Sequence, residues 1–232
     1  MTSGGSEDVV QWRDSNSELS QIRDEDMAYA KELIQSRLKK EVKVEAFLSE
    51  QDCRYCPLAE KLLRDIASAS SLVRLDLRDL RRDRARGDEL GVDQAPTTVI
   101  HASNGTRVYF VGLPSGRQLR TLAEDMVDAS LDDIGMSDFA RAAVSEVRRP
   151  MTVDVFVTPT CPYSPIVVRA AHRLAMVNPN VRARMIEIVE YPDVALKYNV
   201  LGVPKIVIDG KIVFDGALAE EALAEVLQAA AR

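Results

Sequence analysis

The stretch VKVEAFL at residues 42–48 and the motif CRYC at residues 53–56 decide the fold, because close counterparts of both recur later in the chain. The second copy reads VDVFV at residues 153–157 and CPYS at residues 161–164. Each apolar run is typical of a buried β-strand, and each cysteine motif precedes a helical pattern. The repeat predicts a duplicated unit with thiol chemistry. The first copy can close a disulfide on itself, whereas the second copy has a single cysteine.

The elements around the two motifs follow each other in the same order. The first half predicts a strand at 42–48, a helix at 57–68, a strand at 72–77, a short helix at 84–90, a hairpin at 97–111 and a helix at 115–129. The second half repeats this order from 152 to 230, and further helices at 24–40 and 137–149 precede the two halves. A strand, a crossover helix and a parallel strand, followed by a hairpin, form a mixed sheet with helices on both faces. The sequence thus predicts the fold class α/β, with two tandem thioredoxin-fold units, each a mixed β-sheet flanked by helices.

The boundary between the two units is expected near residues 131–135. We interpret residues 1–20, which carry Gly, Ser, Asp and Asn with little periodicity, as a mobile N-terminal tail. Residues 21–132 then form the first unit, with the CRYC site. Residues 133–232 form the second unit, with the CPYS site.

Composition and charge narrow the classes of function. The chain has 232 residues, 46% of them apolar, and a formal net charge of −6, which argues against nucleic acid as a partner. No apolar run approaches the roughly 20 residues that span a bilayer, so no membrane partner is expected. The N-terminus lacks the order of a signal peptide, and we expect a cytoplasmic protein. Three cysteines, an odd number, favour a catalytic or metal role over a structural disulfide framework.

Cys53 and Cys56 have the spacing of a redox-active dithiol. A cysteine just before a helix lies where unpaired N–H groups stabilise a thiolate, which lowers its pKa from about 8.5 toward roughly 3.5–7.5. In such pairs the leading sulfur attacks a target disulfide and the trailing sulfur resolves the mixed disulfide. We therefore assign Cys53 as nucleophile and Cys56 as resolving cysteine, and expect Arg54 to lower the pKa of Cys53 further. The alternative, half of a zinc site, needs two more ligands, and we expect neither a metal nor a cofactor.

Cys161 has the same place before a helix, but Ser164 stands at the resolving position. A site of this kind can attack a disulfide and stays trapped as a mixed disulfide until an outside thiol releases it. Several interpretations stay open. The site is a natural monothiol or vestigial remnant without turnover of its own, Ser164 is an introduced Cys→Ser trap, or Cys161 exchanges with the first site.

A proline opens a strand at the same distance from each motif, since 96 − 53 and 204 − 161 both equal 43. In this fold the bond before such a proline is cis, and we expect the same for Pro96 and Pro204. The backbone of Ala95 and Val203 would then face the active sulfur and offer a short edge to an extended substrate segment. An ordinary trans proline at a strand start is the alternative.

Two acidic residues align when the strands are superimposed, Glu45 in the first and Asp154 in the second. A carboxylate in an apolar strand beside a dithiol has a raised pKa and can shuttle the proton of the resolving thiol. The alternative is an acid at an exposed strand position.

These motifs resemble the glutaredoxin-like protein disulfide oxidoreductases of thermophilic archaea and bacteria. The resemblance runs from about residue 20 to the C-terminus and rests on CPYSP at 161–165, VRAAH at 168–172, YPD at 191–193, KYNV at 197–200, VPKIVI at 203–208 and YFVGLPSG at 109–116. It implies two thioredoxin-fold units packed as one rigid body, which exchange thiols and disulfides on protein substrates. It also implies a thioredoxin-reductase-like flavoenzyme as the electron source. Ser164 departs from the family, whose members usually carry a second cysteine there.

Two further functions compete with this hypothesis. In the first, the chain would be a client-binding module whose first dithiol is only a redox sensor. In the second, it would carry an iron–sulfur cluster through Cys161 and an outside thiol. Whether reduction, oxidation or isomerisation dominates depends on the redox potential, which the sequence does not give.

Overall fold

The computed structural model describes residues 22–51 and 53–232. The interpretation of residues 1–20 as a tail falls outside this described part. Within it, the first half of the chain comprises α2 (Asp24–Arg37), β1 (Val42–Leu48), α3 (Cys56–Ala67), β2 (Val73–Asp79), α4 (Arg84–Leu90), β3 (Thr97–His101), β4 (Arg107–Val111) and α5 (Arg117–Ala129). The second half comprises α6 (Asp138–Ser145), β5 (Met151–Val157), α7 (Ser164–Val177), β6 (Val181–Glu187), α8 (Pro192–Lys197), β7 (Lys205–Ile208), β8 (Ile212–Asp215) and α9 (Glu220–Ala230).

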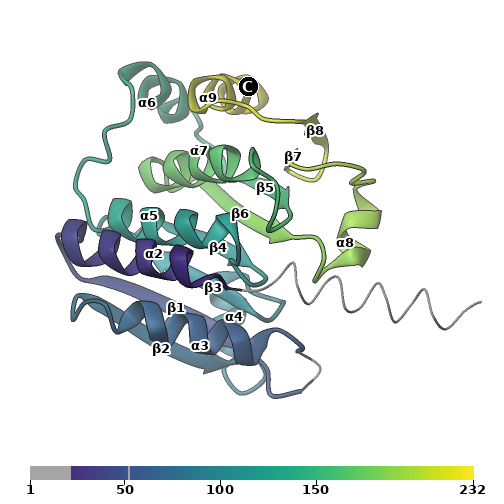
Figure 1. Ribbon diagram of the computed structural model, residues 1–232. Coiled ribbons are helices and arrows are strands. Elements are labelled where there is room, and N and C mark those ends of the chain that lie inside the picture. Colours follow the sequence, from purple (N-terminus) through teal and green to yellow (C-terminus); the bar gives the residue numbers. More distant parts are fainter. Residues whose placement is uncertain (1–21, 52) are drawn as a thin grey trace, which may run out of the picture.

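The strands of the described residues form one eight-stranded sheet in the order β2-β1-β3-β4-β6-β5-β7-β8 (Figure 1). Within each half, the two strands that flank the cysteine helix are parallel and the hairpin is antiparallel, so the predicted mixed sheet is confirmed. The halves join where β4 pairs with β6 in parallel, with Val111 opposite Ile186. This junction makes the carboxyl ends of β4 and β6 neighbours, which matters for the first cysteine motif.

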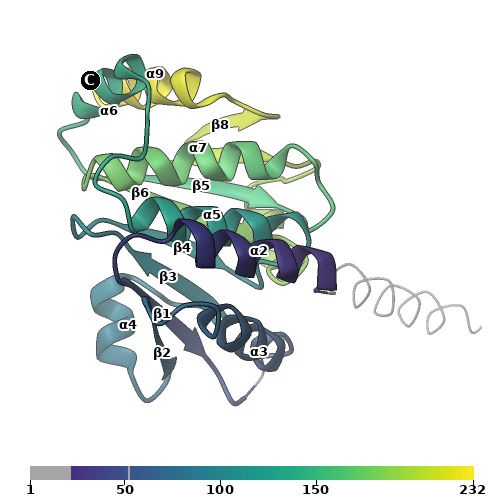
Figure 2. The same ribbon diagram turned by 60° about the vertical axis from the view of Figure 1, so that its left-hand side comes forward.

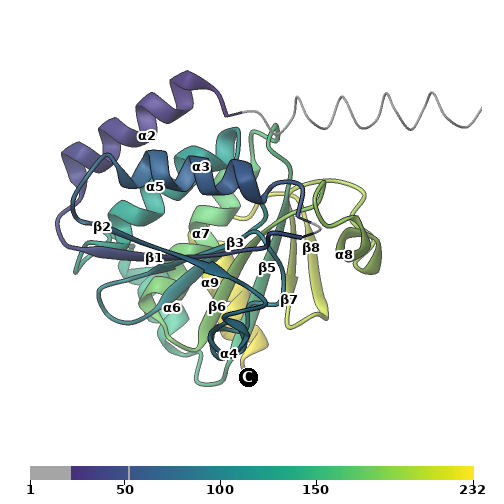
Figure 3. The ribbon, with the colours of Figure 1, turned by 90° about the horizontal axis from the view of Figure 1, so that it is seen from below.

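Side chains alternate between the two faces of the sheet because successive residues of a strand point in opposite directions. In β1, Val44 and Ala46 face the large core under α2, α3 and α5, whereas Phe47 faces a smaller cluster that includes Leu90 of α4. Figure 3 shows α2, α3 and α5 on one side of the sheet and α4 on the other. In the second half α7 covers the first face, and α6 and α9 pack against α7.

Helices α5 and α7 pack side by side across the junction of the halves (Figure 2). Arg169 of α7 forms an ion pair with Asp125 of α5 and lies 2.6 Å from Asp128. His172 Nδ1 lies 2.6 Å from the second oxygen of Asp125, and both side chains are fully buried. One continuous apolar core extends beneath both helices. Removing one partner of such a buried ion pair costs about 3–5 kcal/mol because the other charge is left unpaired, so the contact between the halves requires all three side chains.

The boundaries of several helices differ from the sequence prediction for a local reason. The helix predicted at 137–149 begins as expected, with the Ser137 hydroxyl accepting from Ala140 N at 3.2 Å, but it ends at Ser145. The Asn178 amide donates to the carbonyls of Val144 and Val147, which satisfies them without further helical turns. No helix of the described ranges is both long and apolar enough to cross a membrane.

Candidate active sites

The first cysteine motif lies at the carboxyl end of β1, where the chain turns into α3. Cys56 is the first residue of α3, and Pro57 follows it in the first turn, where a missing N–H costs nothing. Cys53 precedes the helix by three residues and forms a disulfide with Cys56, with a Cα–Cα distance of 5.4 Å. The sequence prediction that this pair can close a disulfide is thus confirmed.

The two sulfurs of the pair have different surroundings. Cys53 is partly exposed, whereas Cys56 is 3% exposed and its Sγ accepts the N–H of Ser49 at 3.3 Å. A cavity of about 320 Å³ reaches both cysteines and is lined by charged side chains, Glu60 and Arg82 among them. An outside disulfide can therefore approach Cys53, while Cys56 is shielded and has an N–H donor for its thiolate.

The bonds before Pro96 and Pro204 are both cis, as predicted. Cys53 Sγ lies 3.4 Å from the carbonyl oxygen of Ala95, and Cys161 Sγ lies 3.4 Å from that of Val203. The backbone before each proline therefore faces its sulfur, in the same geometry in both halves.

The second motif repeats the position of the first without its pair. Cys161 precedes α7 by three residues, and its thiol donates to the Val203 carbonyl. Cys161 is 9% exposed, so its sulfur is more shielded than that of Cys53. Ser164, at the place of Cys56, is fully buried and its Oγ has no hydrogen-bond partner among the described residues. The Ser164 hydroxyl is thus buried at a position where the described residues offer it no hydrogen bond.

Glu45 does not have the role that the strand alignment predicted. Burial alone would raise its pKa, but hydrogen bonds from Arg86 and Lys43 hold the pKa far below its usual range. Its carboxylate lies 2.8 Å from Arg78 and 2.9 Å from His101 Nε2. The predicted raised pKa is therefore wrong, and so is the alternative of an exposed position, because Glu45 is 0% exposed.

Asp154 is likewise buried, and the guanidinium of Arg184 binds both of its oxygens, at 2.6 and 2.7 Å. Like Phe156 it faces away from the core under α7, just as Glu45 faces away from the core under α3. The alignment of the two acids was correct in sequence, but both carboxylates lie on the face of the sheet away from the helices that begin at the cysteine motifs. Each carboxylate forms an ion pair with arginine, Glu45 with Arg78 and Asp154 with Arg184.

The histidines do not lie with the cysteines as zinc ligands would. His101 contacts Glu45 and His172 contacts Asp125. Residues 22–51 and 53–232 contain no group of three or more His, Cys, Asp or Glu side chains that could hold a metal ion. The exposed Arg54 lies next to Cys53 with its guanidinium 5.6 Å from the ring centre of Tyr55.

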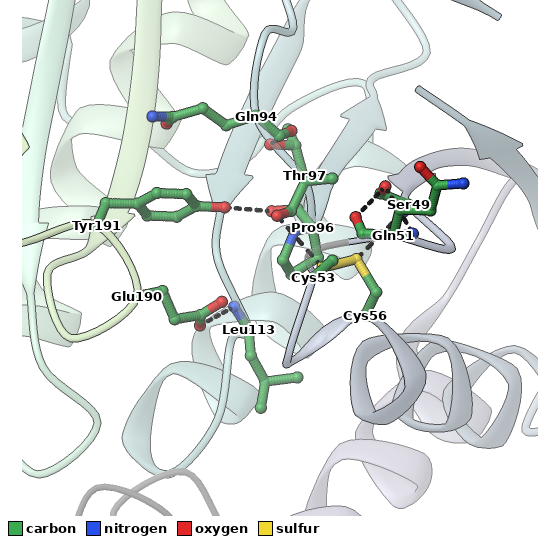
Figure 4. Close-up of a disulfide and its surroundings, with 11 residues drawn as sticks. Ser49, Gln51, Cys53, Cys56, Gln94, Pro96, Thr97, Leu113, Glu190 and Tyr191 are labelled. Carbon is green, nitrogen blue, oxygen red and sulfur yellow. Dashed lines mark hydrogen bonds between the residues drawn. A yellow bond between two sulfur atoms is a disulfide. The ribbon is translucent and has the colours of Figure 1, made fainter. Parts of the chain in front are cut away.

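Sequence reasoning missed two residues of the second half that reach the first site. Figure 4 shows Glu190 and Tyr191 beside Pro96 and Leu113, on the side of the disulfide away from Ser49. The Tyr191 hydroxyl donates to Pro96 O at 3.3 Å, and Glu190 Oε1 accepts from Leu113 N at 2.6 Å. Tyr191 belongs to the YPD run that carries the family resemblance, but no role was assigned to it, and nothing in the sequence showed that β6 would lie beside β4.

Comparisons with known proteins agree with this geometry. A family model described as a thioredoxin domain matches residues 151–228. A thioredoxin of Methanocaldococcus jannaschii is 35% identical over 77 residues, which is 91% of that protein and 33% of this chain. The chain belongs to the thioredoxin family. The family match covers the second half, and the repeated fold extends it to the first.

Solved structures extend the likeness of this thioredoxin-family chain to both halves. A protein disulfide oxidoreductase from Aeropyrum pernix K1 is 28% identical with a TM-score of 0.82, over 91% of this chain and 94% of that one. The N-terminal domain of the alkylhydroperoxide reductase AhpF from Enterococcus faecalis has a TM-score of 0.81 at 22% identity, over 89% of this chain and 100% of that one, and shows the fold alone. The chain is a thiol–disulfide oxidoreductase with two tandem thioredoxin folds.

Proposed function

We propose that Cys53 and Cys56 catalyse thiol–disulfide exchange on protein substrates, with Cys53 as nucleophile and Cys56 as resolving cysteine. The observation that carries this assignment is the asymmetry of the pair. Cys53 is partly exposed and lies 3.4 Å from the Ala95 carbonyl, whereas Cys56 is buried and accepts the N–H of Ser49. A substrate can reach only one of the two sulfurs freely.

The steps follow from this arrangement. The Cys53 thiolate attacks one sulfur of the substrate disulfide, forms a mixed disulfide and releases the other substrate sulfur as a thiolate. The Cys56 thiolate then attacks Cys53 Sγ and releases the second substrate thiolate. The substrate gains two electrons, and the chain is left with the Cys53–Cys56 disulfide. The same steps in reverse oxidise a substrate dithiol.

The residues beside Cys53 support this chemistry. Arg54 supplies a positive charge next to Cys53, which favours the thiolate over the thiol. The backbone at Ala95 and Pro96 offers an extended substrate segment a place to pair beside the attacking sulfur. In the second half Val203 and Pro204 offer the same edge beside Cys161.

Cys161 acts as a monothiol in this proposal. With Ser164 at the resolving position, a mixed disulfide on Cys161 persists until an outside thiol or a thiol of the same chain displaces the substrate. Each turnover leaves the Cys53–Cys56 disulfide, which needs a two-electron donor to return to the dithiol, and a thioredoxin-reductase-like flavoenzyme is the partner of the right chemistry. The likeness to a domain of the reductase AhpF supports such a partner.

We further propose that residues 21–132 and 133–232 act as one rigid body. The buried contacts of Asp125 with Arg169 and His172, and the pairing of β4 with β6, join the two units and support this rigid association.

The test is turnover in the reduction of insulin by dithiothreitol. We expect Cys53→Ser to lower the rate to the uncatalysed background and Cys161→Ser to leave most of it. Full activity in the Cys53→Ser chain, with loss in Cys161→Ser, would move the active centre to the second half. Catalysis by neither site, together with client binding that survives removal of all three sulfurs, would favour the client-binding module instead.

A further inference from the structure

The loop between β6 and α8, which belongs to the second half, contacts the backbone that supports the first redox site. Tyr191 donates its hydroxyl proton to Pro96 O at 3.3 Å, and the Glu190 carboxylate accepts from Leu113 N at 2.6 Å. Both side chains extend from the second half toward the segments of the first half that carry the cis proline and the turn after β4 (Figure 4). The disulfide lies just beyond these segments.

The pairing of the halves explains this contact. Because β4 and β6 are parallel neighbours, the residues that follow Val111 lie beside those that follow Ile186. Gly112 has φ +98°, and a Cβ there would lie 2.8 Å from Glu187 Cβ and 3.0 Å from Glu190 Oε1. Only glycine allows the two loops to approach this closely.

The contacts continue to the reactive sulfur in three steps. Pro96 O accepts from Gly112 N at 2.8 Å as well as from Tyr191, so each half of the chain supplies one donor to this carbonyl. The preceding carbonyl, that of Ala95, lies 3.4 Å from Cys53 Sγ. Tyr191 is therefore separated from the reactive sulfur by a single residue of backbone, the one expected to pair with substrate.

The second redox site provides an internal comparison. Pro204 O accepts from Gly216 N at 2.9 Å, which repeats the contact between Pro96 and Gly112. Gly216 also has a positive φ, +97°, yet a Cβ there would meet nothing within 4 Å. Strand β8 is the edge of the sheet, so no neighbouring loop lies beside Gly216 in the described residues. The second donor to the proline carbonyl is thus a feature of the first site.

Two carboxyl groups, that of Glu187 at the end of β6 and that of Glu190 in the loop after it, are shielded from solvent. Burial raises the pKa of Glu187 to about 7, and burial together with the charge of Glu187 raises that of Glu190 to about 8, although the Leu113 N–H opposes this. Glu187 Oε1 and Glu190 Oε2 have no hydrogen-bond partner among the described residues. The other titratable groups that act on this loop are Tyr191 itself and Asp93. Buried carboxyls of this kind cost stability, which favours a role at the site over a purely structural one.

We propose that Tyr191 and Glu190 are positioning residues of the first redox site, supplied by the second half of the chain. Tyr191 holds the Pro96 carbonyl directly, and Glu190 holds Leu113, the neighbour of the Gly112 whose N–H binds the same carbonyl. Together they keep the backbone at Ala95 and Pro96 in the geometry that receives a substrate segment beside Cys53. This inference rests on the proposed function of the Cys53–Cys56 pair, because it assigns residues to that same site.

The experiment uses the full chain with Cys161→Ser, in which Cys53 and Cys56 are the remaining thiols. We expect Tyr191→Phe to raise KM for a protein disulfide about fivefold, the factor that one lost hydrogen bond gives, with kcat changed less than about twofold. Tyr198→Phe is the matched control, since the Tyr198 ring packs on Phe156 within the second half, and it should leave KM unchanged. Glu190→Gln keeps an acceptor for Leu113 N and should retain KM, whereas Glu190→Leu should raise it.

The outcomes separate this inference from the proposed function. Unchanged KM in both Tyr191→Phe and Glu190→Leu overturns the positioning role, even where Cys53→Ser abolishes turnover. A fall in kcat that merely tracks a lost folded fraction, measured by circular dichroism, also overturns it. Full activity of a Cys53→Ser chain would instead remove the proposed function itself.

Discussion

The two cysteine sites share one backbone and differ in what surrounds it. The sulfur of the first cysteine in each motif, Cys53 or Cys161, lies 3.4 Å from the carbonyl oxygen before a cis proline. The first site adds a second cysteine in disulfide contact, a cavity with charged side chains and contacts from the other half. The second site has a buried serine instead, and exposed apolar side chains around it, with Tyr163 61% and Leu201 89% exposed. The duplicated fold thus sets the position of the leading sulfur, while the neighbouring side chains differ in whether a second sulfur lies within bonding reach of it.

The largest effect is expected when the first site is made like the second. Cys56→Ser removes the proposed resolving sulfur, so in the absence of a free thiol the mixed disulfide on Cys53 persists. Multiple turnover of a protein disulfide should then fall to background when a flavoenzyme reductase, and not dithiothreitol, supplies the electrons. Non-reducing electrophoresis should show a covalent complex with the substrate that dithiothreitol dissolves. Undiminished turnover in this variant would mean that Cys56 has no resolving role.

The buried carboxyls near the first site give a dependence on pH. The pKa values of Glu187 and Glu190 rise from their usual 4.5 to about 7 and about 8, so the folded chain keeps protons that the unfolded chain releases. The stability that the neutral carboxyls contribute is fully present below about pH 4.5 and is lost as pH rises through about 7 to 8, by an amount on the order of a few kcal/mol. Denaturant unfolding of the wild-type chain and of Glu187→Gln/Glu190→Gln at several pH values measures it.

The difference between the two unfolding curves isolates these groups from other carboxylates. The double glutamine variant should lose less stability than the wild type between pH 5 and 8.5. Glu225→Gln, which changes an exposed carboxylate, should follow the wild type. Parallel pH profiles for the wild type and the double variant would contradict the raised pKa values.

The comparison also predicts what a single atom does at the second site. Ser164→Cys places a sulfur at the position equivalent to Cys56 and should close a second disulfide with Cys161. Titration of the oxidised, unfolded chain with a thiol reagent should then find no free thiol, where the wild type has one, that of Cys161. A variant that keeps two reactive thiols would show that the second half cannot bring positions 161 and 164 together.

The smallest expected effect concerns the Ser164 hydroxyl. Because its Oγ is buried and has no hydrogen-bond partner in the described part of the chain, Ser164→Ala should stabilise the protein by about 1 kcal/mol. Ser130→Ala is a control of opposite sign, since the Ser130 hydroxyl donates to Val127 O and accepts from Lys39 N. The free energy of unfolding measures both effects. Equal destabilisation by the two changes would show that the Ser164 hydroxyl does make a stabilising hydrogen bond.

Much of this molecule could be predicted from local pattern alone. The equal spacing from Cys53 to Pro96 and from Cys161 to Pro204 predicted the duplicated fold and both cis bonds, because the chemistry of the motif and its distance to the proline are fixed within each half. The strand at 42–48 and the helix at 84–90 were predicted to the residue.

What could not be predicted depends on contacts between distant segments. The sequence of β1 shows that Glu45 lies in an apolar strand, but not that Arg86, 41 residues further on, would reach it and help hold its pKa low against the effect of burial. Tyr191 follows a strand of the second half, and its contact with Pro96 exists only because β6 pairs with β4. The sequence of either half alone does not predict that β4 and β6 pair with each other.

The most direct test of the account is to locate the substrate on the chain. Reduced wild-type protein is mixed with a protein disulfide, quenched with acid and mapped by mass spectrometry of its peptides. The account predicts an internal Cys53–Cys56 disulfide, with stable substrate adducts confined to Cys161. Stable adducts on Cys53, or a second half that forms none while Cys161 stays reduced, would contradict the claim that one site resolves its own intermediate and the other retains it.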